Sequence, residues 1–224
     1  MSKRVFFPTN NIGKYERYKK SFEKHGIEYN RYLLDCNGEE IKVKVVEDGK
    51  TTRENAEKKA KGYYDEYKKR ICNNNFSIIT TDEALYIDGL ADNEQPGVFV
   101  RRFNGLDGKR ATDEEVVDRY TSFVKKLGGE AKAKWHYSLV MYNGKKFCYL
   151  DWDEHVLFND TPHFPITKGY VLNNITIVKI DENGNKIMLS DLSDEEKEKY
   201  LAKYTDNVSK FINENILEAE LDER

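Results

Sequence analysis

Two periods of apolar and polar residues run along the chain, and each predicts a different kind of element. An apolar residue every three to four positions predicts a helix over residues 12–24, whereas strict alternation over residues 41–46 predicts a strand. Further helices are predicted to begin at Thr51, Thr112 and Ser193, because each is followed three positions later by a glutamate in the spacing of a capping box. The first of these helices is predicted to reach about residue 70 and the second residue 127.

Short β-rich runs between turn residues predict the other strands. They cover residues 4–7, 28–34, 76–81, 134–142, 146–156, 169–180 and 186–189, with residues 84–87 as a candidate continuation of the 76–81 strand after a kink. Asn143-Gly144 is a strong hairpin signal. Helices and strands alternate early and hairpins dominate later, which predicts an α/β fold with a mixed β-sheet flanked by helices and two lobes with a cleft between them.

The domain prediction follows from the same pattern. Residues 1–212 form one two-lobed domain without a Pro-rich linker or internal repeat, and residues 213–224 form a polar tail. The last helix is predicted to end near residue 207.

Composition narrows the class of protein. Apolar residues make up 38% of the 224 residues, enough for a core, and Lys+Arg 37 against Asp+Glu 40 gives a net charge of -3. This balance argues against a polymeric nucleic acid as partner. No run approaches the roughly 20 apolar residues of a membrane helix. Three isolated cysteines, Cys36, Cys72 and Cys148, predict a reducing, cytoplasmic setting without a zinc site.

The turn between the first strand and the first helix is a candidate anion site. Thr9, Asn10 and Asn11 are residue types that cap helices and tolerate unusual backbone angles. Free N–H groups and the helix dipole suit an anion there, and Lys14 adds a full positive charge. An ordinary capped turn is the alternative. The turn is not a Walker A loop, because the spacing of that motif is missing.

Acidic and basic residues near other strand ends are candidates for phosphate chemistry. Magnesium on phosphates is usually held by one or two carboxylates, and Glu47, Asp82 and Glu83 follow predicted strands. Solvated loop acids are the alternative in a chain with 40 acidic residues. Arg101 and Arg102 either clamp phosphate oxygens or form a solvated basic pair.

Five motifs then occur in the order and spacing of a known family. The first two motifs are T-x-N-x-G-K, matched by Thr9, Asn11, Gly13 and Lys14, and E-x-G-x-T-x-x-E-N-A, matched by Glu47, Gly49, Thr51, Glu54, Asn55 and Ala56. The third is the family's acidic motif at the end of a strand, which aligns with residues 81–85. The fourth, P-G followed by S-A-R-Y-x-G, is matched by Pro96, Gly97, Arg102, Phe103 and Gly105, and the fifth, E-L-x-x-E-E-K, by residues 191–197. The sequence therefore resembles the inosine triphosphate pyrophosphatase family, which acts on non-canonical purine nucleoside triphosphates.

The resemblance implies a fold, a reaction and a set of roles. The family has an elongated two-lobed α/β fold, usually a homodimer, with the nucleotide in the cleft, and uses Mg²⁺ to hydrolyse a nucleoside triphosphate to the monophosphate and pyrophosphate. By position, the triphosphate contacts are Thr9, Asn10, Asn11, Lys14, Arg101 and Arg102. Glu47 and Asp82 are the implied metal ligands, and Asp82, with Lys14, is the implied catalytic group that positions or deprotonates water.

The chain departs from the family at both ends of the implied site. Thr81 replaces the first acid of the acidic pair, and we expect Glu83 to restore the missing charge as a metal ligand. At the base-binding end only Gly169-Tyr170 resembles the family's F-G-[YW]-D-P. Its S-H-R is replaced by residues 201–203, where Lys203 partly substitutes for arginine. Tyr170 either stacks on a base or is a buried sheet tyrosine.

The predicted function is therefore a Mg²⁺-dependent nucleoside triphosphate pyrophosphatase with an altered base preference. A catalytically impaired nucleotide-binding or sensing protein of the same fold is the alternative. Hydrolysis of modified pyrimidine or deoxynucleoside triphosphates is a further option within the enzyme class.

Overall fold

The chain divides into two compact units. The structure, a computed structural model, describes residues 4–71, 75–103, 105 and 108–221, and for Lys203 and residues 217–221 it describes the backbone alone. The first unit comprises Met1–Asp82, Tyr137–Asp151 and Leu201–Arg224, and the second unit comprises Glu83–His136 and Trp152–Tyr200. Each unit is therefore assembled from segments that are far apart in the sequence.

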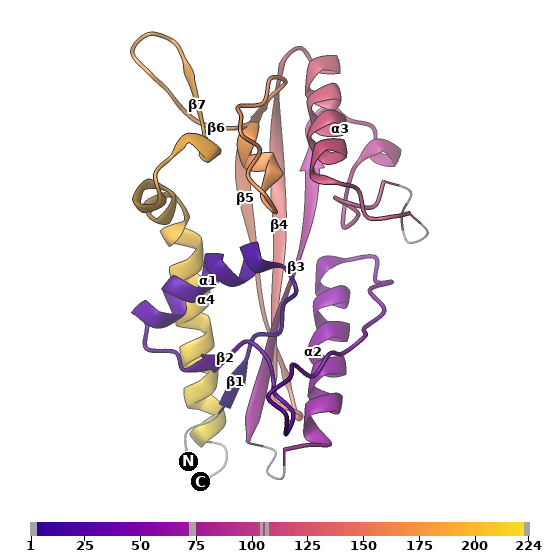
Figure 1. The fold of residues 1–224 in the computed structure, drawn as a ribbon, viewed down its shortest axis with the longest axis vertical. Helices are drawn as coiled ribbons and strands as arrows, with labels where there is room; N and C mark the ends of the chain where they lie inside the picture. Colours follow the sequence, from indigo (N-terminus) through magenta and orange to yellow (C-terminus); the bar gives the residue numbers. More distant parts are fainter. Residues whose placement is uncertain (1–3, 72–74, 104, 106–107, 222–224) are drawn as a thin grey trace. The chain divides into compact units, whose positions relative to one another are not determined.

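Seven strands form one sheet in the order β2-β1-β3-β4-β5-β6-β7 (Figure 1). The strands are β1 (Arg4–Phe6), β2 (Tyr29–Asn30), β3 (Phe76–Ile87), β4 (Glu130–Tyr142), β5 (Phe147–Asn159), β6 (Thr176–Ile180) and β7 (Lys186–Met188), and the helices are α1 (Ile12–Lys24), α2 (Thr52–Lys68), α3 (Asp113–Lys126) and α4 (Asp194–Leu221). β1 pairs in parallel with β2 and β3, whereas β6 pairs antiparallel with β5 and β7. The predicted mixed α/β class is confirmed.

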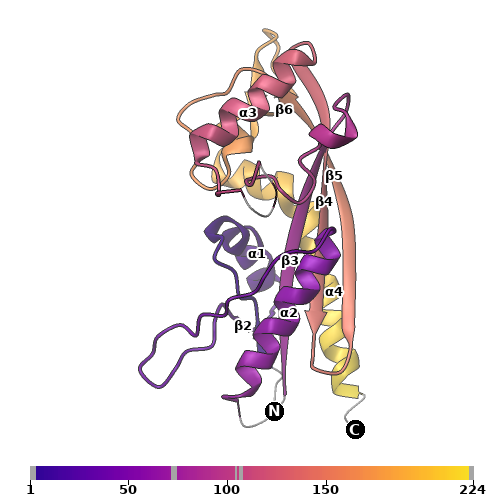
Figure 2. The same cartoon turned by 90° about the vertical axis from the view of Figure 1, so that its right-hand side faces the viewer.

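Two adjacent phenylalanines explain how the first unit packs around β1. Phe6 contacts the rings of Tyr67 and Phe76, whereas Phe7 contacts Tyr18 and Phe22 of α1. Successive side chains of an extended chain point to opposite sides, so one phenylalanine packs toward α2 and the next toward α1. Burying each ring contributes about 1.5–3 kcal/mol relative to exposure. Figure 2 shows α2 running alongside β3.

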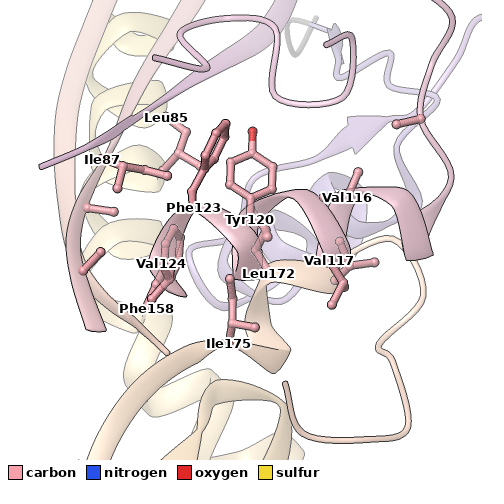
Figure 3. Close-up of a cluster of buried hydrophobic side chains, with 14 residues drawn as sticks. Leu85, Ile87, Val116, Val117, Tyr120, Phe123, Val124, Phe158, Leu172 and Ile175 are labelled. Atoms are coloured by element: carbon pink, nitrogen blue, oxygen red, sulfur yellow. The ribbon is translucent and has the colours of Figure 1, made fainter. Parts of the chain in front are cut away.

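The second unit is organised around α3. Tyr120, Phe123 and Val124 of this helix pack against Leu85 and Ile87 of β3 (Figure 3). The same cluster contains Phe158 of β5, together with Leu172 and Ile175 near the short 3₁₀ turn η3 (Val171–Asn174). α3 and η3 are thereby held to one core.

Caps and turns set the element boundaries at the positions where local signals predicted them. The three predicted capping boxes, at Thr51, Thr112 and Ser193, are present. The hairpin between β4 and β5 turns at residues 143–146, where the Asn143 side chain accepts from the N–H groups of Lys145 and Lys146. Gly144 has φ +87°, and a Cβ there would overlap the Tyr64 hydroxyl, so only glycine fits.

Three predictions of secondary structure were wrong, and two predicted strands were too long. Of residues 28–34 only Tyr29–Asn30 form a strand, and of residues 169–180 only Thr176–Ile180, with Val171–Asn174 in a 3₁₀ turn. The described residues 41–46 form no strand; their alternation arises because Ile41, Val43 and Val45 pack onto the cluster that α2 builds. β3 runs without interruption through Asp82 and Glu83, so these acids lie within a strand and not at its end.

The third correction concerns the last helix, which continues to Leu221. Ile212 is fully buried, and the Asn213 side chain donates to the carbonyl of His25 after α1. Contacts with α1 therefore extend the helix beyond the predicted end near residue 207. None of the described helices combines the length and apolarity needed to cross a membrane.

Candidate active site

The turn from β1 into α1 is capped by Asn11. Its Oδ1 accepts from the N–H groups of Gly13 at 3.0 Å and Lys14 at 3.3 Å, and the Thr9 hydroxyl accepts from Asn11 N at 3.2 Å. Thr9 and Asn11 thus use their side chains to fix the turn, as N-cap residues do. Asn10, between them, is exposed.

Two residues that the sequence analysis did not select hold the turn from outside. The Arg31 guanidinium donates twice to the Thr9 carbonyl, at 2.8 and 3.0 Å, and the Tyr32 hydroxyl donates to the same oxygen at 2.5 Å. The Tyr32 hydroxyl also lies 3.1 Å from Asn10 Oδ1, and Arg31 stacks over the Tyr15 ring at 4.8 Å. These contacts fix the backbone of the turn and place a second positive charge next to it.

Asp82 is nearly buried and is held by two residues of α2. It is 9% exposed; its Oδ2 accepts from Asn55 Nδ2 at 3.2 Å and its Oδ1 from Lys59 Nζ at 2.8 Å. Asn55 and Lys59 are four residues apart and therefore share one face of the helix. The capping box at Thr51 fixes where that helix starts, and so which side chains face Asp82.

Asn55 also connects Asp82 to the loop before α2. Its Oδ1 accepts from Gly49 N at 2.8 Å. A Cβ at Gly49 would lie 2.7 Å from that oxygen, so glycine is required for the contact. The spacing of Glu47, Gly49 and Asn55 therefore has a structural reason, since the loop that carries Glu47 is tied to the residue that holds Asp82.

Lys59 joins these groups into one cluster. Its Nζ lies 2.9 Å from the Thr81 carbonyl, 2.8 Å from Asp82 Oδ1 and 3.5 Å from Glu47 Oε2. Lys14 Nζ reaches the same Thr81 carbonyl at 3.5 Å. The structure thus brings together Lys14, Glu47 and Asp82, which were predicted, with Lys59, which was not.

The base-binding and basic residues predicted for the site belong to the second unit. Arg101 Nη1 donates to Asp113 Oδ1 at 2.7 Å, and Asp113 Oδ2 accepts from Gly169 N at 3.2 Å. Arg102 and Tyr170 are half-buried in the same unit. Arg101 therefore has a carboxylate partner within its own unit, and its contact with the phosphates stays a prediction. The side chain of Lys203 lies outside the described residues.

The match to known proteins covers most of the chain. The model of the Ham1 family matches residues 5–203. The chain belongs to the Ham1 family. The resemblance inferred from the five motifs is thus confirmed.

The relatives of this Ham1 chain are distant. It is 28% identical over 203 residues to a dITP/XTP pyrophosphatase of Aquifex aeolicus, covering 88% of this chain and 89% of that protein. It is 29% identical over 116 residues to a dITP/XTP pyrophosphatase of Clostridium perfringens, covering 50% and 52% of the two chains.

Solved structures have the same fold. The Ham1 protein of Coxiella burnetii matches with a TM-score of 0.66 at 18% identity, covering 96% of this chain and all of that one. The Ham1 protein of Staphylococcus aureus matches with a TM-score of 0.64 at 19% identity, covering 95% of this chain and all of that one.

The cluster around Asp82 in this Ham1 chain offers the donor set that magnesium uses on a phosphate. Among the described residues no three His, Cys, Asp or Glu side chains are close enough to form a complete protein cage for a metal. Mg²⁺ is typically bound by one or two carboxylates plus substrate oxygens, so two carboxylates that share one cation fit it. Asp82 and Glu47, both within 3.5 Å of the Lys59 ammonium, are such a pair.

Glu83 lies on the face of β3 opposite to Asp82. It follows Asp82 directly in the uninterrupted strand β3, and consecutive strand side chains leave from opposite faces. Thr81 and Glu83 are two residues apart and therefore share a face, so Glu83 stays a predicted substitute for the missing acid at Thr81. Burial, Arg101 and Arg102 lower the pKa of Arg110, and the charge of Glu83 opposes this shift.

The position of Lys59 on a predicted helix is the signal in the sequence that indicates a buried partner. On α2 it falls at the same helical spacing as Asn55 and Thr52, on a face otherwise occupied by buried alanines and tyrosines. A lysine on an apolar face whose register is fixed by a capping box predicts a buried partner. Arg31 had no comparable signal, because its contact with Thr9 depends on the tertiary fold.

Proposed function

We propose that this protein hydrolyses a nucleoside triphosphate between the α- and β-phosphates, giving a nucleoside monophosphate and pyrophosphate. The single observation that carries the proposal is the position of Asp82, a nearly buried carboxylate fixed by Asn55 and Lys59 beside the carbonyl that Lys14 also reaches. The relatives from Aquifex aeolicus and Clostridium perfringens are dITP/XTP pyrophosphatases, which supports this activity.

Each residue of the cluster has a role in the proposed reaction. The N-terminal turn with Thr9, Asn10 and Asn11, together with Lys14 and Lys59, binds the triphosphate through N–H groups and ammonium charges. Water attacking phosphorus needs alignment and charge neutralisation more than a strong nucleophile. Asp82 orients the water and accepts its proton, because its carboxylate is held rigidly by two donors on α2.

Glu47 and Asp82 would hold Mg²⁺ together with phosphate oxygens of the substrate. The ion would supply charge stabilisation on the phosphates when bound. Lys59 already neutralises part of the carboxylate charge at this position, which keeps two acids close together.

The base preference is proposed to differ from that of purine-specific relatives. The aspartate of F-G-[YW]-D-P is replaced by Val171, which is 2% exposed and belongs to the apolar core. A polar site that reads one base rejects others because its buried groups would be left unpaired. Without such groups, discrimination between bases depends on stacking, for which Tyr170 is the candidate, and on Lys203.

The test is product analysis with Mg²⁺ over a panel of canonical and modified nucleoside triphosphates, with pyrophosphate separated from orthophosphate. Pyrophosphate plus a monophosphate is the expected result. Orthophosphate alone would show that a different bond is cleaved and would overturn the proposal.

One observation favours the second candidate, a nucleotide-binding protein without turnover. The first acid of the family's pair is replaced by Thr81, which is 6% exposed. This position therefore carries a hydroxyl where the family has a carboxylate. A nucleotide that raises the melting temperature without being hydrolysed would establish this candidate.

A homodimer and a cytoplasmic location complete the proposal. The homodimer follows from the family resemblance, and sedimentation at several protein concentrations tests it. Cys36 is a free thiol, in keeping with a reducing setting, and Cys72 lies outside the described residues.

A further inference from the structure

Asp113 uses its two oxygens for two different segments of the second unit. Oδ1 accepts from Arg101 Nη1 at 2.7 Å, and Oδ2 accepts from the backbone N–H of Gly169 at 3.2 Å. The side chains of Asp113 and Arg101 are 25% and 19% exposed. One partly buried carboxylate thus joins the segment before α3 to the segment that carries Tyr170.

Helix α3 does not need this carboxylate for its own start. Thr112 caps the helix by accepting from Glu115 N at 3.2 Å, and the Glu115 side chain accepts from Thr112 N at 2.7 Å. Glu114 supplies a further acid in the first turn and is exposed. A helix-capping role therefore leaves the contacts of Asp113 unexplained.

The segment that Asp113 holds is fixed internally by backbone hydrogen bonds. Tyr170 N donates to the Thr167 carbonyl, and the Tyr170 carbonyl accepts from Asn173 N. Gly169 has φ +82°, a conformation that favours glycine and leaves its N–H available for Asp113. Val171 and Leu172 pack into the core beside α3. The hydrogen bond from Gly169, on the other side of Tyr170, therefore fixes the backbone from which the Tyr170 side chain extends.

The carboxylate is charged under ordinary conditions. Burial by itself would raise the pKa of Asp113, but the hydrogen bonds from Arg101 and from Gly169 N–H hold it below the ordinary value. Both bonds are therefore charge-assisted and stronger than neutral ones.

We infer that Asp113 is a positioning residue for nucleobase recognition, which fixes the Gly169-Tyr170 turn and is itself fixed by Arg101. The inference rests on the proposed function, because it takes Tyr170 as the group that contacts the base. It assigns Arg101 to the base end, through Asp113, and not to the triphosphate. Losing Asp113 weakens the contribution of the base to binding and leaves the contribution of the phosphates unchanged.

The experiment compares ligands that share phosphates and differ in the base. Calorimetric Kd values are measured with Mg²⁺ for the α,β-methylene analogues of inosine and uridine triphosphates and for inorganic tripolyphosphate, which has no base. The variants are Asp113→Ala and Asp113→Asn, and Glu114→Gln removes one charge from the same helical turn as the matched control.

For Asp113→Ala we expect the Kd of the tighter-binding analogue to rise about tenfold, while the Kd of tripolyphosphate changes less than about twofold. Asp113→Asn keeps an acceptor for Gly169 and loses the ion pair, so we expect a smaller rise and a folded protein by circular dichroism. Glu114→Gln should leave all three Kd values unchanged.

Three results would overturn the inference. Equal changes for the analogue and tripolyphosphate would mean that Asp113 supports the unit as a whole, and no change for either would mean that it positions nothing. A wild type that binds the analogues no more tightly than tripolyphosphate would overturn it as well, since no base contribution exists to be lost. Turnover is measured separately, in the product analysis. If the protein binds the analogues but does not hydrolyse nucleotides, the proposed reaction is refuted, and the Kd values still decide the role of Asp113.

Discussion

The polar networks of the two units hold different kinds of group. In the first unit Asn55 and Lys59 fix a side chain, the carboxylate of Asp82. In the second unit the carboxylate of Asp113 fixes a backbone, the turn at Gly169. A reacting group must be held at a defined position, whereas a backbone can be held while the side chains around it change. Around Asp82 the residues accordingly match most positions of the family motifs, with Thr81 and Glu83 as departures. Around Tyr170 only Gly169-Tyr170 matches.

The strongest way to test this comparison is to remove the reactive carboxylate. For Asp82→Asn we expect a loss of at least about a thousandfold in kcat, because the amide cannot accept a proton, with the fold retained because Asn can still accept from Lys59. Single-turnover kinetics and circular dichroism measure the two effects. Asp48→Asn, an exposed acid beside Glu47, is the control, and wild-type rates in Asp82→Asn would refute the assigned role.

Removing Lys59 tests whether the cluster acts as one unit. We expect Lys59→Met to lower kcat/KM about a hundredfold, because both a phosphate contact and the group between two carboxylates are lost. Lys58→Met is the matched control, since Lys58 is exposed and pairs with exposed Asp48. Similar kinetics for the two variants would contradict the role of Lys59.

Comparing Glu47 with its rival Glu83 sharpens the assignment of the metal ligands. For Glu47→Gln we expect the Mg²⁺ concentration at half-maximal rate to rise about tenfold, and for Glu83→Gln to stay within about twofold. The reason is that Glu47 shares Lys59 with Asp82, whereas Glu83 leaves from the opposite face of β3. Titration of the rate with Mg²⁺ measures both. A shift with Glu83→Gln as large as that with Glu47→Gln would return Glu83 to the metal site.

The smallest expected effect concerns stability in acid. The pKa of Asp113 lies below its ordinary value of 3.8 in the folded protein, so its contribution to stability is present above that value and is lost as the pH falls through the folded pKa. We expect Asp113→Asn to be less stable than wild type by about 1 kcal/mol at pH 7, with the difference disappearing as the pH falls through the folded pKa. Urea unfolding at pH 7 and over a series of acid pH values measures this, and a difference independent of pH would assign the effect to packing.

Much of the fold follows from local signals in the sequence. The caps at Asn11, Thr51 and Thr112 and the hairpin at Asn143 form as predicted, because each depends on residues within a few positions of one another. The strand predicted at residues 41–46 does not form. Alternation of apolar and polar residues shows that one side of the segment is buried, but it does not show which element buries that side.

The candidate site was predictable in part for the same reason. Lys14, Glu47 and Asp82 were found through motifs, while Lys59, Arg31 and Asp113 depend on partners 12 to 56 positions away in the chain. Nothing near Arg101 in the sequence indicates that Asp113 is its partner.

The long reach of α4 has a consequence for how the chain is made. Ser21 in α1 bonds to the Thr205 carbonyl at 2.8 Å and lies 2.5 Å from the Ser209 hydroxyl, all three residues being buried. During vectorial synthesis α1 emerges from the ribosome long before α4 does. The turn that begins α1 is therefore translated early, but the helix after it lacks its packing partner until the last helix has emerged.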